Sequence, residues 1–320
     1  MIVVTGGAGF IGSNIVKELN RRGREDILVV DELKEGDSFK NLLGLHFADY
    51  LSKDDFIESL ADFDDSIDAI FHEGACSDTM EYDVGFMMRT NYDYSKTLLH
   101  FAQEEEIPFI YASSAATYGT GKNGFTEEDR CEEALNPYAA SKLLFDRYVR
   151  KILPHANSQI VGLRYFNVYG FQEHHKGKMA SIAYQLYQQI KESDRAYLFK
   201  GTDGIPDGEQ KRDFIFVKDV VEVNLWFLEQ KGASGIYNCG TGQAHSFNEV
   251  ARAVINAVGH GQIVYKEFPK ILKGKYQNFT QANQSKLLAA GYDRGFHDLN
   301  AAVKEYCDFL QAGGYFSYVD

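Results

Sequence analysis

The chain has 320 residues, of which 44% are hydrophobic and 25% are charged, and its formal net charge is −13 with a pI near 5.2. This length exceeds that of a single typical core, so we expect one large domain and a smaller one with a cleft between them. The acidic balance argues against nucleic acid as a partner, and no apolar run approaches the roughly 18 residues that span a membrane.

The chain's start and its cysteines indicate the compartment. The first predicted strand begins at Ile2, which leaves no room for a signal peptide, so we expect a cytoplasmic protein. The cysteines show no metal-type or disulfide-type spacing, which predicts reduced core residues, namely Cys76, Cys131, Cys239 and Cys307. His174 and His175 have no third ligand at a suitable spacing, so we expect no bound metal.

Short β-branched runs alternate with amphipathic stretches through the first half of the chain, which is typical of βαβ units. We predict strands at residues 2–5, 27–30, 69–72, 109–112 and 160–165. Helices are predicted between them, at residues 11–22, 54–60, 86–103 and 138–152. These elements predict an α/β fold with a Rossmann-type, doubly wound parallel sheet.

Beyond residue 171 the pattern loosens, with a strand predicted at 213–217 and a helix at 220–228. This predicts a smaller, discontinuous α/β lobe that binds the substrate. We expect residues 1–170 to form a dinucleotide-binding domain, to which residues 213–239 return, and residues 171–212 and 240–320 to form the substrate lobe. Residues 203–210 are typical of an exposed loop.

Three glycines, Gly6, Gly9 and Gly12, lie between the first predicted strand and the first predicted helix. Gly6 permits a tight turn, Gly9 lets the backbone approach a pyrophosphate, and Gly12 allows close helix packing. Asp31 ends the next strand, where a carboxylate can accept the hydroxyls of the adenosine ribose. Together these residues predict a dinucleotide site.

The choice between NAD and NADP stays open at this point. Asp31 favours NAD because a carboxylate repels a 2′-phosphate, whereas three lysines could reach that phosphate, namely Lys34, Lys40 and Lys53. Residues 72–77, His-Glu-Gly-Ala-Cys-Ser, follow another strand and include small residues that let a cofactor lie against the backbone. A plain strand-to-loop turn explains that segment equally well.

Tyr138 and Lys142 lie one helical turn apart and follow Asn136 and Pro137, which suits a helix start. The strand before them ends near Ser114, at the carboxyl edge where α/β sheets keep their chemistry. An ammonium near a phenol stabilises the phenolate and lowers its pKa from about 10, and a serine can hydrogen-bond the reacting oxygen. The pattern predicts transfer of a hydride and a proton; the alternative is an exposed pair on a surface helix.

These motifs, together with residues 164–170, resemble the extended short-chain dehydrogenase/reductase family, which contains nucleotide-sugar epimerases and dehydratases. Within that family, the chain is similar along nearly its whole length to the ADP-L-glycero-D-manno-heptose 6-epimerases. The most specific matches are residues 72–77, 175–177, 211–214 and 272–277.

The resemblance implies a homo-oligomer, a pentamer, with bound NADP, which inverts one carbinol of an ADP-heptose in lipopolysaccharide precursor synthesis. Tyr138 and Lys176 would transfer protons, one on each face, with Ser114 and Lys142 assisting; alternatively, Lys176 is a loop lysine that binds the diphosphate. Cofactor contacts are implied for Gly6, Gly9, Phe10, Ile11, Gly12, Asp31, Glu32, Ser38, Lys53, Glu73, Gly74, Ala75, Cys76, Ser77, Thr90, Lys142, Val168 and Lys176. Substrate contacts are implied for Asn167, Val168, Lys178, Gln185, Phe199, Lys200, Gly201, Thr202, Arg212 and Tyr276.

The chain departs from the family pattern at several positions. Ser38 and Glu32 stand where the family commonly has Lys and Asn, and both changes weaken the case for NADP. The other departures are Thr90 for Asn, Lys178 for Ser, Gln185 for His, and an insertion at residues 204–210.

Three alternative functions share parts of this pattern. A nucleotide-hexose 4-epimerase would keep all the cofactor residues, but the heptose-type segments argue against it. A 4,6-dehydratase carries Asp-Glu where this chain has Ala115 and Ala116, and so would lack the acid for water elimination. A non-catalytic NADP-sensing module would usually have lost the Tyr138/Lys142 pair, which this chain keeps.

Overall fold

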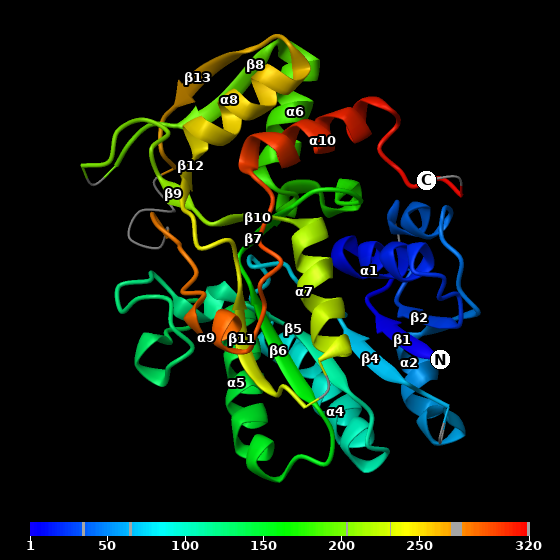
Figure 1. The fold of residues 1–320 in the computed structure, drawn as a ribbon. Coiled ribbons are helices and arrows are strands. Elements are labelled where there is room, and N and C mark those ends of the chain that lie inside the picture. Colours follow the sequence, from blue (N-terminus) through cyan, green and yellow to red (C-terminus); the bar gives the residue numbers. More distant parts are fainter. Residues whose placement is uncertain (34–35, 64–65, 203, 231, 270–276, 319–320) are drawn as a thin grey trace.

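The computed structural model describes residues 1–33, 36–63, 66–202, 204–230, 232–269 and 277–318. Among these residues, the central sheet comprises seven parallel strands: β1 (Ile2–Thr5), β2 (Ile27–Asp31), β3 (Asp49–Ser52), β4 (Ala69–His72), β5 (Phe109–Ser114), β6 (Ile160–Tyr165) and β11 (Gly235–Cys239). Their order is β3-β2-β1-β4-β5-β6-β11 (Figure 1). The direction of winding reverses between β1 and β4, at the kind of switch point where such sheets bind ligands. The predicted Rossmann-type fold is confirmed.

The sheet has two strands that the sequence pattern did not predict. β3 is an edge strand that pairs only with β2 in this sheet. It begins at the exposed Asp49 and has no buried residue, so its sequence contains no apolar run that could have predicted it. β11 is buried throughout but short, and it begins with Gly235, which has a positive φ. It pairs in parallel with β6 and so returns this segment to the central sheet. The boundaries of the two lobes stay a prediction.

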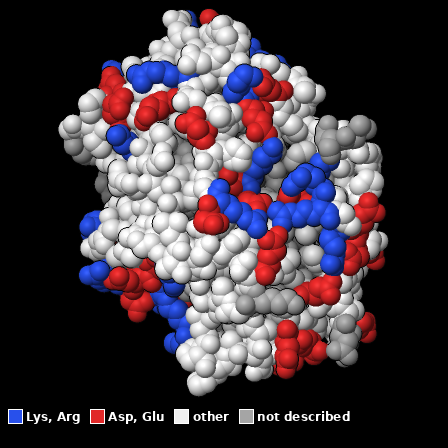
Figure 2. All heavy atoms as spheres, viewed as in Figure 1, with Lys and Arg blue, Asp and Glu red and all other residues white. Residues whose placement is uncertain are grey.

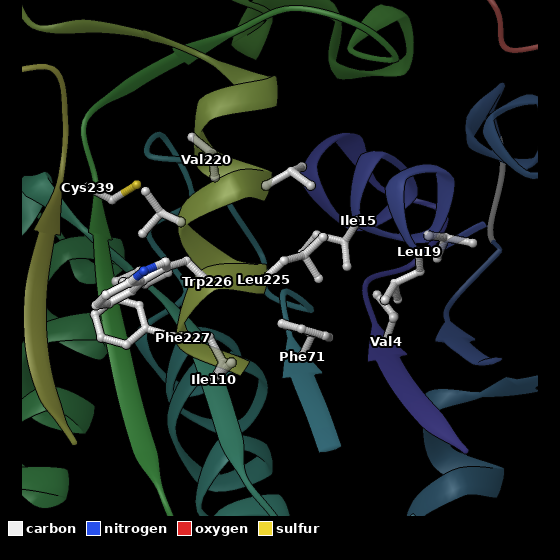
Figure 3. Packing of buried hydrophobic residues seen from close by; sticks show 14 of the residues in the cluster. Val4, Ile15, Leu19, Phe71, Ile110, Val220, Leu225, Trp226, Phe227 and Cys239 are labelled. Carbon is white, nitrogen blue, oxygen red and sulfur yellow. The ribbon is translucent and has the colours of Figure 1, made fainter. Parts of the chain in front are cut away.

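Helices cover both faces of the sheet. α1 (Phe10–Arg21) and α7 (Val217–Glu229) pack on one face, whereas α2 (Lys53–Glu58), α4 (Tyr94–Glu104) and α5 (Pro137–Ile152) pack on the other. Figure 3 shows side chains of the first face converging in one buried cluster, which includes Val4, Ile15, Phe71, Ile110 and Leu225. Burial of each large apolar side chain contributes about 1.5–3 kcal/mol, so this packing holds α1 firmly against the sheet.

The helix predicted at residues 86–103 is present, but it contains a π-helical turn that the sequence pattern did not predict. α3 (Val84–Met88) is followed by one π-helical turn, Arg89–Asp93, before α4 begins. The wider turn brings Asn91 into the interior, where its side chain accepts from Cys76 N at 2.8 Å and donates to Cys76 O at 3.0 Å and to Ser141 Oγ at 3.1 Å. Single π-helical turns are frequent at functional sites, and these bonds compensate for the irregular helix.

The second lobe packs helices on a small sheet. α6 (Ile182–Ser193), α8 (Phe247–Val258) and α10 (Leu299–Gln311) share a buried cluster with β8 (Arg195–Phe199), and β13 (Gln262–Lys266) pairs with β8 in parallel (Figure 1). The short α9 (Ser285–Ala289) lies beside β11.

The strand predicted at residues 213–217 is present but shorter, and a separate two-residue strand precedes it. β9 (Lys211–Arg212) pairs with β12 (His245–Ser246), whereas β10 (Phe214–Phe216) pairs with β7 (Asn167–Tyr169), and α7 already begins at Val217. Asp213 separates the two strands because its buried carboxylate accepts hydrogen bonds from Thr241 N, Thr241 Oγ1, Gly242 N and Ala282 N, at 2.7–2.9 Å.

The loop expected to be exposed at residues 203–210 is only partly so. Gly208 and Gln210 are buried, and a Cβ on Gly208 would lie 2.4 Å from the Asn248 amide oxygen. The described part of this loop is therefore packed against α8.

Charged side chains of both signs intermingle on the face that carries α1, α7 and α10 (Figure 2). Arg22 of α1 pairs with Glu18 at 2.9 Å and with Glu222 and Glu229 of α7 at 2.7 and 2.6 Å, and Arg294 pairs with the same two acids of α7. These cations are thus neutralised and do not form the basic patch that a nucleic-acid backbone requires. In the described part of the chain, no helix combines the length and apolar character that crossing a bilayer requires.

Candidate active site

The turn between β1 and α1 depends on its glycines. Gly6 has φ +67°, and a Cβ there would lie 2.6 Å from Gly74 N; a Cβ on Gly12 would lie 2.1 Å from Gly6 O. Gly9 precedes α1, and no side chain caps this helix. The first N–H groups of α1 are therefore available to an anion, as in phosphate-binding turns.

A cavity of about 440 Å³ opens at the carboxyl edge of the sheet beside this turn. Its lining includes Thr5, Val30, Phe86, Arg89 and Tyr94. Eight residues predicted to contact the cofactor also line it, namely Gly6, Asp31, Glu32, Lys53, Gly74, Ala75, Cys76 and Thr90. The structure thus brings the two glycine-containing segments and the end of β2 together around one space.

The Asp31 carboxylate is already engaged with the glycine turn. It accepts hydrogen bonds from Ala8 N at 2.8 Å and from Glu32 N at 2.6 Å, and burial raises its pKa. Next to it, Glu32 and Lys53 form an ion pair at 2.9 Å. Asp31 therefore braces the turn as well as facing the cavity, and the added charge of Glu32 is balanced by a lysine.

The remaining predicted cofactor residues lie outside the cavity lining. Phe10 and Ile11 begin α1, and Val168 lies in β7. Ser38 is half-buried and begins a 3₁₀ turn, Ser38–Leu42, whereas Ser77 is exposed in the loop after β4. Lys34 and Tyr276 fall outside the described residues.

Tyr138 and Ser114 meet where α5 starts beside the end of β5. α5 begins at Pro137, and the Asn136 side chain caps it by accepting from Ala139 N at 2.8 Å. The Ser114 hydroxyl hydrogen-bonds the Tyr138 phenol, which opposes the effect of burial; burial is larger and raises the pKa of Tyr138. The expectation that the pKa of this phenol is lowered is therefore wrong for this structure, because desolvation dominates.

Lys142 lies one turn further along α5 and is buried. Its ammonium donates to Ala112 O at 2.8 Å. Burial lowers the pKa of Lys142 to about 8, and the charges of Glu73 and Asp146 oppose that shift. Glu73 is itself desolvated: burial raises its pKa to about 7, against a hydrogen bond from the Tyr165 hydroxyl and the charge of Lys142. Lys142 and Glu73 thus each affect the pKa of the other at the carboxyl edge of the sheet.

Lys176 lies in the 3₁₀ segment His174–Met179 and approaches the glycine turn from the second lobe. Its ammonium is 5.0 Å from the centroid of the Phe10 ring. Burial lowers the pKa of Lys176, and the charge of Glu173 opposes this. Within the described ranges, no hydrogen bond joins Lys176 to Tyr138.

The two neighbouring histidines have separate partners. His174 stacks on Tyr315 with ring centroids 4.6 Å apart, whereas His175 Nδ1 lies 3.2 Å from Asn41 Nδ2. Among the residues that the structure describes, no group of three or more His, Cys, Asp or Glu side chains could hold a metal ion. The cysteines are free; Cys131, Cys239 and Cys307 are buried, and Cys76 is half-buried beside the cavity.

The model of the NAD dependent epimerase/dehydratase family matches residues 2–240, which include the glycine turn, Ser114, Tyr138, Lys142 and Lys176. The chain belongs to this family. It is 54% identical over 311 residues to the ADP-L-glycero-D-manno-heptose-6-epimerase of Alkalilimnicola ehrlichii, covering 96% of this chain and 97% of that relative.

Two solved structures of the epimerase/dehydratase family are similar to the whole chain. The ADP-L-glycero-D-manno-heptose-6-epimerase of Helicobacter pylori is 32% identical with a TM-score of 0.84, covering 97% of this chain and 96% of that one. The UDP-glucose 4-epimerase of Thermus thermophilus in complex with NAD is 26% identical with a TM-score of 0.78, covering 97% and 98%. The cofactor of the family is a nicotinamide dinucleotide.

None of the described residues that we predicted to contact the substrate lines the 440 Å³ cavity. Asn167 is exposed in β7, and Phe199 and Lys200 are exposed at the end of β8, followed by the half-buried Gly201 and Thr202. Arg212 is buried in β9, with its guanidinium 5.7 Å from the Phe247 ring. Lys178 is exposed, whereas Gln185 donates to Ala180 O at 2.7 Å.

The sequence pattern did not single out several residues that support this epimerase site. Asn91 holds the Cys76 backbone, and its only signal was its position beside Thr90. Asp146 lies one turn after Lys142 on the same face of α5, and Arg164 is a charge inside an otherwise apolar strand. Because a buried charge needs a partner, the pairing of these two could have been sought from the sequence.

Proposed function

We propose that this chain converts ADP-D-glycero-D-manno-heptose to ADP-L-glycero-D-manno-heptose by inverting C6″, a step in the synthesis of lipopolysaccharide precursors. The observation that most strongly supports this proposal is the 54% identity, across nearly all of both chains, to a heptose 6-epimerase. The geometry supports it, because Ser114, Tyr138 and Lys142 gather at the sheet edge beside the dinucleotide cavity.

The residues present fit a nicotinamide dinucleotide. The cavity lies at the switch point of the sheet. Where Gly6 and Gly74 line it, the two backbones lie close together with no side chain between them, so a ligand can approach the backbone there. The uncapped start of α1 would hold the diphosphate, and Lys142 would hold the nicotinamide ribose. When bound, the dinucleotide supplies reversible hydride transfer, which inversion at a carbon without an acidic C–H requires.

We propose NADP as the preferred dinucleotide. Lys53 and Arg89 line the cavity and can meet a 2′-phosphate, and the Asp31 carboxylate is engaged by the Ala8 amide. NAD is the alternative, because Asp31 and Glu32 add negative charge at the same end of the cavity.

Replacing Lys53 with Ala is expected to weaken NADP binding by about tenfold and to leave NAD binding nearly unchanged, since a charge-assisted hydrogen bond contributes about 1.5–3 kcal/mol. Calorimetric titration of both dinucleotides measures this. Lys96→Ala is the control, because the Lys96 ammonium lies 4.6 Å from the centroid of the Tyr148 ring and this residue is not part of the cavity lining. Equal losses for both dinucleotides, or NAD as the copurifying cofactor, would contradict the preference.

Tyr138 and Lys176 are proposed to move the protons on opposite faces of the heptose. Burial favours the uncharged form of both groups, a phenol at Tyr138 and an amine at Lys176. One of the two groups, Tyr138 Oη or Lys176 Nζ, takes the proton as the carbinol is oxidised, the other gives one as the ketone is reduced, and proton exchange with solvent restores both groups before the next turnover. Ser114 orients the reacting oxygen through its hydroxyl.

We also propose a homo-oligomer, a pentamer, in the cytoplasm. The support is the resemblance to the heptose 6-epimerases, and sedimentation of the purified protein measures the number of subunits.

Purified protein with its own cofactor is expected to convert the D-glycero substrate to its L-glycero epimer with no net change in the cofactor. Proton NMR at C6″ follows the conversion, and absorbance at the reduced-nicotinamide band follows the cofactor. UDP-glucose serves as the comparison substrate, because a nucleotide-hexose 4-epimerase would convert it. Conversion of UDP-glucose alone would support the 4-epimerase, and tight cofactor binding without turnover of either sugar would support a sensing module.

A further inference from the structure

The segment that carries Lys176 is fastened on the side of the glycine turn. Asn14 Nδ2 donates to Phe10 O at 2.8 Å and to Phe171 O at 2.9 Å, so one side chain joins α1 to the start of the segment. Asn41 Nδ2 likewise donates to Ala8 O at 3.0 Å and to Gln172 O at 3.2 Å. The segment therefore has a fixed position relative to the turn.

The backbone then reverses sharply at Gln172. This buried residue has φ +71°, a left-handed conformation that costs a side-chain-bearing residue free energy. The turn directs Phe171 into a cluster with the aromatic residues of α10, and directs Glu173 toward α6. Such strain persists where the surrounding contacts determine the conformation.

Glu173 is the second fastening point and is fully buried. Its Oε1 accepts from Gly170 N at 3.2 Å, from Ser181 Oγ at 2.7 Å and from Tyr306 Oη at 2.9 Å, and its Oε2 accepts from Ser181 N at 2.5 Å. One carboxylate thus joins both ends of the segment 170–181 to each other and to α10. Burial raises the pKa of Glu173, and the hydrogen bonds from Ser181 and Tyr306, together with the charge of Lys176, oppose that shift and favour the ionised carboxylate.

The charge of Glu173 also acts on Lys176, three residues away. The other groups here with shifted pKa values are His174 and His175, whose pKa values burial lowers, for His175 to about 4, and Tyr184 and Tyr306, whose pKa values burial raises. Each of these shifts favours the uncharged form near neutral pH. Phe10 faces the ammonium from α1 and carries no charge. Glu173 is therefore the charged group that acts on the amine from its own segment.

We propose that Glu173 is a positioning residue, which fastens the segment 170–181 so that the Lys176 amine stays beside the glycine turn. The inference rests on the proposed role of Lys176 in proton transfer. Glu173 does not touch the reacting atoms, and it acts through the lysine by geometry and by charge.

Glu173→Gln tests this, because it keeps the size of the side chain and removes the charge. Amide hydrogen exchange in residues 171–181 is expected to become roughly tenfold faster, and kcat to fall about 10–100-fold with little change in KM, since small misplacements of a reacting group cost that much. The pKa of the Lys176 amine falls because the carboxylate that favours its charged form is gone, so the acid limb of the kcat profile moves to lower pH.

NMR titration of reductively ¹³C-methylated protein measures that pKa directly, and Lys176→Met identifies its signal. Exchange and titration need no substrate, so they remain informative if the heptose is not turned over. Wild-type exchange and a wild-type Lys176 pKa in Glu173→Gln would overturn the proposal.

Glu249→Gln is the matched control, because Glu249 accepts from Ser246 N at 2.6 Å at the start of α8 as Glu173 does at the start of α6. It is expected to change neither the Lys176 pKa nor exchange in residues 171–181, and equal effects in both variants would overturn the proposal.

Tyr306→Phe is a second test, because it removes one hydrogen-bond donor to Glu173 and keeps the charge of the carboxylate. It should raise exchange in the segment by a smaller factor and leave the acid limb in place. If Glu173→Gln does not fold, unchanged exchange in Tyr306→Phe overturns the proposal.

Discussion

Replacing Tyr138 with Phe is expected to lower kcat by roughly 10²–10⁴-fold, the usual contribution of a positioned acid or base. The change removes the phenol oxygen that bonds Ser114 and keeps the ring, so folding and cofactor binding should persist. Turnover of the heptose by NMR, thermal unfolding and the bound cofactor fraction measure the three quantities. Near-normal kcat would show that the phenol moves no proton.

Tyr148→Phe is the matched control for this change. It lies on the same helix, and its hydroxyl lies 2.6 Å from His100 Nε2, away from the cavity. It should leave kcat unaltered.

Lys176→Met completes the experiment, since it keeps the length of the side chain and removes the amine. A loss of kcat with the cofactor retained supports the second proton-transferring group. A loss of dinucleotide affinity with little change in kcat would instead support the diphosphate contact, which the position of the ammonium over Phe10 also permits. Full activity would exclude both roles.

The sequence predicted those parts of the fold whose signals are local. The glycine turn, five strands of the sheet and the start of α5 each depend on residues within a few positions of one another. The π-helical turn was missed because the bonds that compensate for it come from Cys76 and Ser141, far from Asn91 in the chain. The edge strand β3 was missed because only its pairing with β2 makes it a strand.

The candidate site likewise has features that local sequence predicts and features that depend on distant parts of the chain. The spacing of Tyr138 and Lys142 gave their shared face, and Ser114 followed from the end of a strand. The direction of the Tyr138 pKa could not be obtained from spacing, because it depends on how completely the folded chain excludes water. Glu173 was missed for a related reason, since Tyr306 approaches it from the other end of the chain.

Arg164 should prove the most costly charge to remove. It is fully buried in β6, where it donates to Asp146 Oδ2 at 2.8 Å and to Glu132 Oε1 at 2.5 Å. Asp146 also accepts from the hydroxyls of Tyr111 and Ser113, each at 2.9 Å, so this cluster fastens α5 to the end of β5. The helix and the strand that it joins carry Tyr138 and Ser114.

Arg164→Met is expected to lower the free energy of unfolding by about 3–5 kcal/mol, because it leaves the buried Asp146 carboxylate without its cation and removes one of the arginines that pair with Glu132. Urea unfolding near neutral pH measures this. Arg22→Met is the control: Arg22 contacts three acids, against two for Arg164, but lies at the surface, where ion pairs contribute about 0–1 kcal/mol. Equal losses in the two variants would contradict a special role for the buried cluster.

The same variant has a predictable pH dependence. In Glu132, burial raises the pKa, but hydrogen bonds from Arg150 and Arg164 outweigh it, so the pKa lies below its ordinary value of 4.5. A lowered pKa stabilises the fold above 4.5, and this contribution is lost as the pH falls through the folded-state value. Without Arg164 the pKa of Glu132 rises, so protonation relieves the buried charge at a higher pH. The difference in unfolding free energy between wild type and Arg164→Met should therefore shrink as the pH is lowered, and a difference that grows toward acid pH would contradict this account.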